Sequence, residues 1–564
     1  MRLISKRWLW LLTAMVGMGC FLLVSARNAN ENRQQTISVD LSSQSSKIRN
    51  IFSDVNCWDF HGPWTSQAAK RPDNYFSVHY PFIKKIQFMT ATGGSAERDL
   101  FLNPGDRSDV TDYKFTDILS ALHQVVRQGL KPMIITGNVP EKLSQDPVKG
   151  AFGVNVRPPA DYNAYYNYIR KLAEAVVREF GIDEVKTWSW GVLTEYENRD
   201  WFITADNSSR STKIAYFKLY DYTVAALQDV IGAGNLFVGA HSMTVSKGLW
   251  DEQEFIDHVA KGINYKTGKR GTQINFLTSS FYDLSPGIPI PGNLTLEEAI
   301  RLLRGRAEAD GLKGLKYGID EGRLIGGPPD DNRPLTSRIV ALSYQGAADA
   351  RMFRIMTDLQ ADWFSTWSLS TTGLWGGVRL VSTHVASLGY RMAGDRRVNL
   401  TVNGAPADTT DEVNGLAGFN DSTGTVHLML YNYNDSIAAR SDETPVITIH
   451  HIAPRSGGSV TIKQWTIDDT HGNFWPSWSA DMHARGLTNA AFNWSKYSTE
   501  LPGNLLHQAD KEYWLSHEKA YRSLAALDST NRSVVISDHM LTLRPHLAHH
   551  GVVFFEISNV KRNK

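Results

Sequence analysis

Residues 131–193 contain the pattern that decides the fold: KPMIIT at 131–136, YNAYYNYIRKLAEAVVREF at 162–180 and VKTWSWGVL at 185–193. The first and third segments are short and apolar, which is typical of buried strands, whereas apolar residues in the second recur at helical spacing. A strand, a helix and another strand in this order predict a βαβ unit, because parallel neighbouring strands are joined by a crossover helix.

The same alternation extends over residues 51–393. We expect further helices at 214–230 and 296–309, and further strands at 235–240 and 316–319. Alternating strands and helices over this length fit one (β/α)₈ TIM barrel with loop insertions. The sequence therefore predicts an α/β fold with a barrel at 51–393.

From about residue 394 the pattern changes to short alternating segments separated by turn residues. This pattern predicts an antiparallel β-sandwich domain at 394–564. Residues 27–50 are expected to form a linker and an N-terminal strand, at 36–41, that pairs with this β-domain. The strands expected in the β-domain lie at 398–402, 425–431, 446–450, 460–467, 533–536 and 552–557.

Residues 1–26 have the features of a secretory signal peptide. Arg2, Lys6 and Arg7 precede an apolar run from Trp8 to Val24, and small residues follow at the expected cleavage site. The run is long enough that an uncleaved membrane anchor is the alternative. No other segment is apolar enough to suggest a membrane span. We expect an extracytoplasmic protein (periplasm, cell surface or secreted), and its few cysteines favour a bacterial source.

Composition and charge exclude several classes of protein. The chain carries 59 Lys and Arg against 58 Asp and Glu, a net charge of +1, so it lacks the basic excess of nucleic-acid-binding proteins. Cys20 and Cys57 are too few for a disulfide scaffold or a four-cysteine zinc site. Histidines gather at 450–451 and 546–550, where positions beside strands explain them. We expect no metal, no cofactor and no nucleic-acid partner.

Two of the predicted barrel strands end in carboxylates. Glu195 lies in WSWGVLTEYEN at 188–198, and Glu321 lies in KYGIDEG at 316–322. Capping of the next helix explains any single glutamate of this kind. The separation of the two fits three βα units, which predicts strands four and seven, and barrel enzymes place catalytic groups at the carboxyl ends of strands. Two carboxyls facing each other there are the apparatus of glycoside hydrolysis. Glu197 is an alternative acid, because residues two apart on a strand share a face.

These segments resemble glycoside hydrolases of family 39. The stretch at 158–188 is similar to a family helix that leads to a Trp and then to a strand ending in Asn-Glu-Pro. Residues 129–140, 275–282 and 361–368 resemble the family's third, sixth and eighth strands, and 467–473 resembles part of its β-domain. The family comprises β-xylosidases, α-L-iduronidases and bacterial exopolysaccharide hydrolases, all retaining. The resemblance thus implies a carbohydrate substrate.

The resemblance also implies roles for individual residues. Glu195 falls on the acid/base and Glu321 on the nucleophile of a retaining mechanism, which requires carboxyls about 5–5.5 Å apart and a raised pKa at the acid. Thr194, next to the acid/base, and Tyr282, on the sixth strand, fall on substrate-binding positions. Three tryptophans are candidates for stacking on a sugar, although core packing also explains each of them: Trp58, Trp363 and Trp367.

The chain departs from the family at several supporting positions. Thr194 replaces an Asn that binds the sugar 2-hydroxyl, and Tyr196 replaces the Pro after the acid/base. On the second strand Gln87 replaces an Arg and Met89 a His, and Ser280 replaces the His of the sixth strand. Because both glutamates are kept, we interpret these changes as an altered substrate. The alternative is a weak or inactive glycan-binding or polysaccharide-accessory protein on the same fold. The sequence leaves the sugar, exo or endo action and the oligomeric state open.

Overall fold

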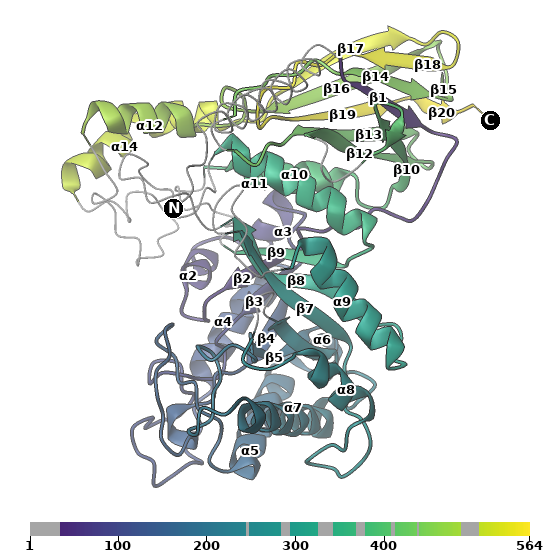
Figure 1. The fold of residues 1–564 in the computed structure, drawn as a ribbon. Helices are drawn as coiled ribbons and strands as arrows, with labels where there is room; N and C mark the ends of the chain where they lie inside the picture. Colours follow the sequence, from purple (N-terminus) through teal and green to yellow (C-terminus); the bar gives the residue numbers. More distant parts are fainter. Residues whose placement is uncertain are drawn as a thin grey trace, which may run out of the picture.

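The computed structural model contains a parallel barrel and a β-sheet domain that lies against it (Figure 1). It describes residues 34–243, 248–283, 294–324, 342–367, 378–407, 412–436, 439–486 and 507–563. The leader predicted at 1–26 lies outside these residues. Within the described ranges, no helix is long and apolar enough to cross a membrane.

Eight parallel strands close into a barrel in chain order, which confirms the predicted TIM-barrel fold. The strands are almost wholly buried, because side chains fill the interior and helices cover the outside. They are β2 (Asp54–Cys57), β3 (Lys85–Phe88), β4 (Lys131–Thr136), β5 (Ser189–Thr194), β6 (Val238–Met243), β7 (Phe276–Asp283), β8 (Lys316–Leu324) and β9 (Trp363–Trp367).

The helices of the barrel follow the predicted pattern, and those expected at 162–180 and 296–309 have these bounds in the structure. The strand expected at 185–193 begins later, at Ser189, because residues 182–185 form a short helix after Gly181. The helices are α2 (Pro63–Ala69), α3 (Tyr75–His79), α4 (Thr116–Arg127), η1 (Glu141–Leu143), α5 (Tyr162–Phe180), α6 (Ile182–Val185), α7 (Ser209–Ile231), α8 (Gln253–Lys261), α9 (Leu296–Ala309), α10 (Ser343–Asp358) and α11 (Val381–Arg391).

The β-domain is a ten-stranded, mostly antiparallel sheet. Its apolar core is formed by side chains from both halves of the sheet. The N-terminal strand β1 (Thr36–Asp40) lies inside this sheet. It pairs antiparallel with β10 (Arg396–Val402) and parallel with β14 (Val446–His450), so residues near the start of the described chain are part of the C-terminal domain. The other strands are β10 (Arg396–Val402), β11 (Ala405–Pro406), β12 (Val413–Asn420), β13 (Thr425–Asn432), β14 (Val446–His450), β16 (Ser459–Ile467), β17 (Ser529–Val535), β18 (Met540–Leu543) and β19 (Val552–Ser558), with a separate pair β15 (Ile452–Pro454) and β20 (Val560–Arg562).

Helices α10 and α11 lie between the barrel and the sheet (Figure 1). One apolar cluster contains side chains of these helices together with Met429, Trp465 and Phe554 of the sheet. The Tyr344 and Tyr433 hydroxyls lie 2.7 Å apart across the contact. The β-domain therefore shares a core with the outside of the barrel.

Within the described part of the β-domain, two helices lie where we expected strands and turns only. They are α12 (Trp475–Ala484) and α14 (Gln508–Leu524), between β16 and β17. Trp478 and Trp514 meet edge to face at 5.1 Å in a small separate core. Leu380, which follows the eighth barrel strand, packs into this core. The helix pair is thus tied to the barrel at the side where the strands end.

Candidate active site

Glu195 and Glu321 lie at the carboxyl end of the barrel, on its fourth and seventh strands. Glu195 directly follows β5, and Glu321 lies in the second half of β8. Each residue is 8% exposed, so both side chains are largely withdrawn from water. The predicted strand positions are therefore those of the structure.

Irregular strand pairing positions both glutamates. The register between β5 and β6 shifts at Val192/Thr194, and that between β7 and β8 shifts at Ser279/Ser280. Such bulges turn side chains away from the strict alternation of a strand. Glu195 consequently contacts Ser280 on β7, although β6 lies between β5 and β7.

The backbone around Glu195 adopts an uncommon conformation. Leu193, Glu195 and Ser242 have φ angles of 50°, 43° and 55°, in the left-handed region that non-glycine residues rarely enter. The amide of Glu195 donates to the carbonyl of Ser242 at 2.9 Å, which links the ends of β5 and β6. Strained backbone of this kind persists only where neighbouring contacts hold it, and it is frequent at functional sites.

Two polar side chains bind the Glu195 carboxylate. Ser280 Oγ donates to Oε1 at 2.7 Å, and Asn198 Nδ2 donates to Oε2 at 3.0 Å. Burial raises the pKa of Glu195 above its usual range and outweighs these hydrogen bonds, which lower it, while the nearby Asp200 carboxylate adds to the rise. A carboxyl with this environment can act as an acid at higher pH than an exposed glutamate.

Ser280 also connects Glu195 with Glu321. Its backbone is in register with Glu321 in the β7–β8 pair, while its hydroxyl contacts Glu195. The Ser242 hydroxyl lies 2.7 Å from the Ser280 hydroxyl and belongs to the same buried group. One serine thus contacts Glu195 and is paired through its backbone with Glu321, at the position where the family resemblance led us to expect a His.

The structure places Glu197 differently from the strand-based interpretation. The strand ends at Thr194, and Glu197 follows in a turn where it is fully buried. Burial raises the pKa of Tyr196 and Tyr216, and the nearby Glu197 charge adds to the rise. The two tyrosine rings are stacked, and Tyr216 lies on α7. Glu197 therefore lies beside this aromatic pair, whereas the Glu195 carboxylate contacts Ser280 of β7.

The substrate-binding candidates have different surroundings. Trp58 is half-buried, with its ring 5.6 Å from Trp201 and 6.4 Å from the exposed Phe152. Trp363 is buried within the barrel and donates to Asp320 Oδ1 at 2.6 Å, so its ring belongs to the interior. The backbones of Tyr282 and Trp367 lie at the ends of β7 and β9, and their side chains lie outside the described residues.

Thr194 and the replaced positions on β3 make defined contacts. The Thr194 hydroxyl lies 2.8 Å from His241 Nδ1, directed inward. Gln87 is fully buried and donates to two carboxylates inside the barrel. Met89 packs with Val154 and Trp201.

Sequence reasoning missed Asn198, Ser242, His241 and Phe152. Asn198 follows Glu195 by three residues, a spacing typical of a turn that folds back on a strand end. His241 and Ser242 lie near the end of the fifth strand, where a polar residue could have been flagged by the same rule as the glutamates. Phe152 offered no signal beyond its loop position.

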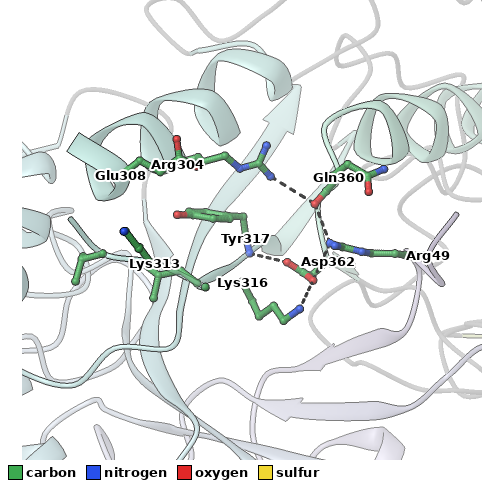
Figure 2. A pocket seen from close by; sticks show the side chains of 11 residues that line it. Arg49, Arg304, Glu308, Lys313, Lys316, Tyr317, Gln360 and Asp362 are labelled. Atoms are coloured by element: carbon green, nitrogen blue, oxygen red, sulfur yellow. Dashed lines mark hydrogen bonds and ion pairs between the residues drawn. The ribbon is translucent and has the colours of Figure 1, made fainter. Parts of the chain in front are cut away.

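A separate pocket of about 460 Å³ lies at the opposite end of the barrel (Figure 2). Its floor includes Lys316 and Tyr317, the first residues of β8, and Asp362, which precedes β9. Asp362 contacts Arg49 at 2.8 Å and Lys316 at 3.1 Å, as Figure 2 shows. Because Lys316 begins the strand that carries Glu321 near its other end, this pocket is not part of the glutamate site.

The structure thus places one glutamate after the fourth strand of a TIM barrel and another near the end of the seventh. The sequence model described as "Glycosyl hydrolases family 39" matches residues 103–283. This segment contains β4 to β7 and Glu195. About a third of the chain thus matches glycoside hydrolase family 39.

Individual relatives agree with this assignment. A β-xylosidase of Caldicellulosiruptor saccharolyticus is 28% identical over 171 residues, which cover 30% of this chain and 33% of that protein. The match thus spans about a third of that relative's length. The structure of a monomeric β-xylosidase from Caulobacter crescentus CB15 aligns with a TM-score of 0.63 at 17% identity, over 93% of this chain and 99% of that one. The GH39 enzyme from Xanthomonas axonopodis pv. citri gives a TM-score of 0.64 at 14% identity, over 93% and 97%. At these identities the structures establish a shared fold.

Proposed function

We propose that this chain is a retaining glycoside hydrolase with Glu195 as acid/base and Glu321 as nucleophile. The observation that carries the proposal is that Ser280 bonds the Glu195 carboxylate while its backbone is paired with Glu321 at the carboxyl end of the barrel. The match of residues 103–283 to family 39 supports it, and so does the raised pKa of Glu195, which an acid in this reaction needs.

Each step has an assigned group. The Glu321 carboxylate attacks the anomeric carbon while Glu195 gives its proton to the departing glycosidic oxygen, so one C–O bond forms as another breaks. Glu195, now ionised, takes a proton from water, and this water attacks the anomeric carbon and releases Glu321. Both glutamates return to their starting states, and the product keeps the anomeric configuration of the substrate.

The proposed substrate is an oligosaccharide or polysaccharide. A β-linked xyloside is the first glycoside to test, because the Caldicellulosiruptor relative is described as a β-xylosidase. Half-buried Trp58 and exposed Phe152 offer aromatic faces next to Trp201, which suits stacking on a sugar ring. The altered contacts at Gln87 and Ser280 support a sugar different from that of other family members.

The experiment is hydrolysis of a panel of aryl glycosides and bacterial exopolysaccharides by the wild-type chain, Glu195→Gln and Glu321→Gln. We expect wild-type turnover with a retained anomeric product by proton NMR, and loss of turnover in both variants. Binding of a glycan without turnover anywhere on the panel would refute hydrolysis and favour the glycan-binding alternative.

We further propose that the protein is exported. The basic and apolar leader at 1–26 supports this location. Fractionation of a bacterial host that expresses the full chain, followed by N-terminal sequencing, tests it. A mature N-terminus after Ala26 outside the cytoplasm is expected, whereas an intact leader on cytoplasmic protein would contradict export.

A further inference from the structure

A chain of buried polar side chains crosses the barrel beneath the glutamates. Thr194 Oγ1 lies 2.8 Å from His241 Nδ1, and His241 Nε2 lies 3.2 Å from Gln87 Oε1. Gln87 Nε2 in turn lies 3.0 Å from Asp320 Oδ1. Thr194 is 2% exposed and the other three residues are fully buried.

The two ends of this chain are informative. Thr194 directly precedes Glu195, and Asp320 directly precedes Glu321. The connection therefore runs from the residue beside the candidate acid/base, through β6 and β3, to the residue beside the candidate nucleophile.

The hydrogen-bond partners fix the direction of each bond. Gln87 Nε2 lies 3.1 Å from Asp54 Oδ2 as well as 3.0 Å from Asp320 Oδ1, and two carboxylate oxygens require donors. Gln87 Oε1 is then an acceptor, so His241 must carry its proton on Nε2. His241 Nδ1 accordingly accepts from the Thr194 hydroxyl. The pattern assigns one tautomer, the neutral imidazole with hydrogen on Nε2.

The charges facing His241 are few. Asp320 Oδ2 lies 3.8 Å from its Nε2, and Asp54 is bonded to the same Gln87 amide and lies 3.2 Å from Lys85 Nζ. Burial lowers the pKa of His241, and the Asp320 carboxylate opposes this effect without reversing it. The lowered pKa favours the neutral imidazole, the form in which Nδ1 accepts from the Thr194 hydroxyl.

Further donors hold the Asp320 end. Trp363 Nε1 donates to Oδ1 at 2.6 Å, and the Thr278 hydroxyl donates to Oδ2. Asn56 Nδ2 donates to the Asp320 carbonyl at 2.9 Å, which fixes the backbone that continues into Glu321. With four strands contributing donors, Asp320 has little freedom to rotate or shift.

We propose that Gln87 and His241 are positioning residues that form a hydrogen-bond relay from Thr194 to Asp320 and so fix the separation of Glu195 and Glu321. This inference rests on the proposed function of the two glutamates. A retaining pair tolerates little change, because its carboxyls must lie about 5–5.5 Å apart, and a misplacement of about 1 Å can cost about 100-fold in rate. The relay holds the two strand ends at a fixed separation across the barrel interior. Neither strand end fixes this separation by itself.

The test is a double-mutant cycle in steady-state kinetics on the full chain. Thr194→Val removes the hydroxyl at one end of the relay, and Gln87→Met removes the amide in its middle. We expect each variant to lower kcat about tenfold, as a displacement of less than about 1 Å would do, with KM changed little. Because both act on one relay, the double variant should lose little more than either single variant.

Two matched controls separate positioning from general loss of stability. Thr194→Ser keeps the hydroxyl and should restore most of the lost kcat. Thr357→Val removes a buried threonine hydroxyl from α10, where it donates to the Phe353 carbonyl at 2.8 Å, and should leave kcat unchanged. Losses of the two single variants that multiply in the double variant, or an equal loss in Thr357→Val, would overturn the relay.

A spectroscopic measurement of the His241 tautomer tests the relay independently of catalytic activity. Nitrogen-15 NMR of histidine-labelled protein, assigned with His241→Asn, should show the neutral Nε2–H tautomer of His241 at pH 7. An Nδ1–H tautomer or an imidazolium would overturn the assigned bond directions. A wild-type chain that hydrolyses nothing on the glycoside panel would overturn the proposed function, and the positioning role with it. An active wild type with additive variants would overturn the relay alone.

Discussion

Replacing Ser280 with alanine removes one of the two hydrogen bonds to the Glu195 carboxylate, the 2.7 Å bond to Oε1. A hydrogen bond to a charged group contributes about 1.5–3 kcal/mol, and about 1.4 kcal/mol corresponds to one pKa unit. Protonated Glu195 keeps part of this interaction, so the difference between its two states is smaller than the full bond. We therefore expect Ser280→Ala to raise the pKa of Glu195 by about one unit.

The sign of the effect on activity follows from the role of Glu195. As an acid it must be protonated, so activity falls as the pH rises through its pKa. A higher pKa in Ser280→Ala therefore moves the alkaline limb of the kcat/KM profile to higher pH by about one unit. The assay is kcat/KM for an aryl glycoside from about pH 4 to pH 9, a range that brackets ordinary and raised carboxyl pKa values.

The neighbouring serine supplies the control. Ser279 is also buried on β7, but its hydroxyl lies 3.0 Å from the backbone carbonyls of Met243 and Ser280, and it is not one of the groups bonded to the Glu195 carboxylate. Ser279→Ala should leave the alkaline limb in place. An alkaline limb that stays fixed or moves to lower pH in Ser280→Ala, or that shifts equally in Ser279→Ala, would refute the reasoning.

Three further predictions concern the acid, the β-domain and a helix start. Glu195→Gln should lower kcat/KM by about 10²–10⁴-fold, whereas Glu197→Gln, fully buried among helices, should retain wild-type turnover; the reverse order in the same assay would reassign the acid. Burial lowers the pKa of His427, but its hydrogen bonds with Asp395 and Glu556 outweigh burial and raise the pKa above the ordinary 6.5. The protonated histidine therefore stabilises the folded state at pH values below 6.5, and this stabilisation is lost as the pH rises through the raised pKa. Calorimetric Tm should thus fall more between pH 6 and about pH 9 in wild type than in His427→Gln, and parallel Tm curves would contradict this. Thr295 forms a capping box with Glu298 at the start of α9, so Thr295→Ala should cost about 0.5–2 kcal/mol of stability and Thr295→Ser much less by thermal unfolding; equal Tm values for the two variants would contradict the cap.

Local patterns in the sequence were sufficient to predict the barrel. Helices at 162–180 and 296–309 have the predicted bounds, because their apolar faces recur at helical spacing and Asp161 and Thr295 cap their starts. The strand numbers of Glu195 and Glu321 were also predictable, since they follow from the count of βα units. These features depend on neighbours in the sequence.

The contacts of the site were not predictable in this way. Ser280 meets Glu195 across 85 residues, and Gln87 meets His241 across 154. The left-handed φ of Glu195 ends the strand, which removes the two-residue periodicity behind the interpretation of Glu197. A glutamate in that conformation has no sequence signal, because glycine, Asn and Asp are the usual residues there.

The helices of the β-domain were missed for a different reason. In α12 the buried side chains are Trp475, Trp478 and Met482, whose spacing is helical but short. Their partners are distant in the sequence: Leu380 lies far before them and Trp514 beyond residues 487–506, so the sequence alone did not show that these apolar faces pack together. A search for helical spacing of tryptophans would have identified the segment.

Trapping the reaction midway tests the assignment of the nucleophile most directly. The chain is incubated with the 2-fluoro analogue of the aryl glycoside that it hydrolyses fastest, and its proteolytic peptides are analysed by mass spectrometry. We expect the mass of one fluorinated sugar on the peptide containing Glu321, and no label in Glu321→Gln. A label on any other residue, or hydrolysis that inverts the anomeric centre, would contradict the account.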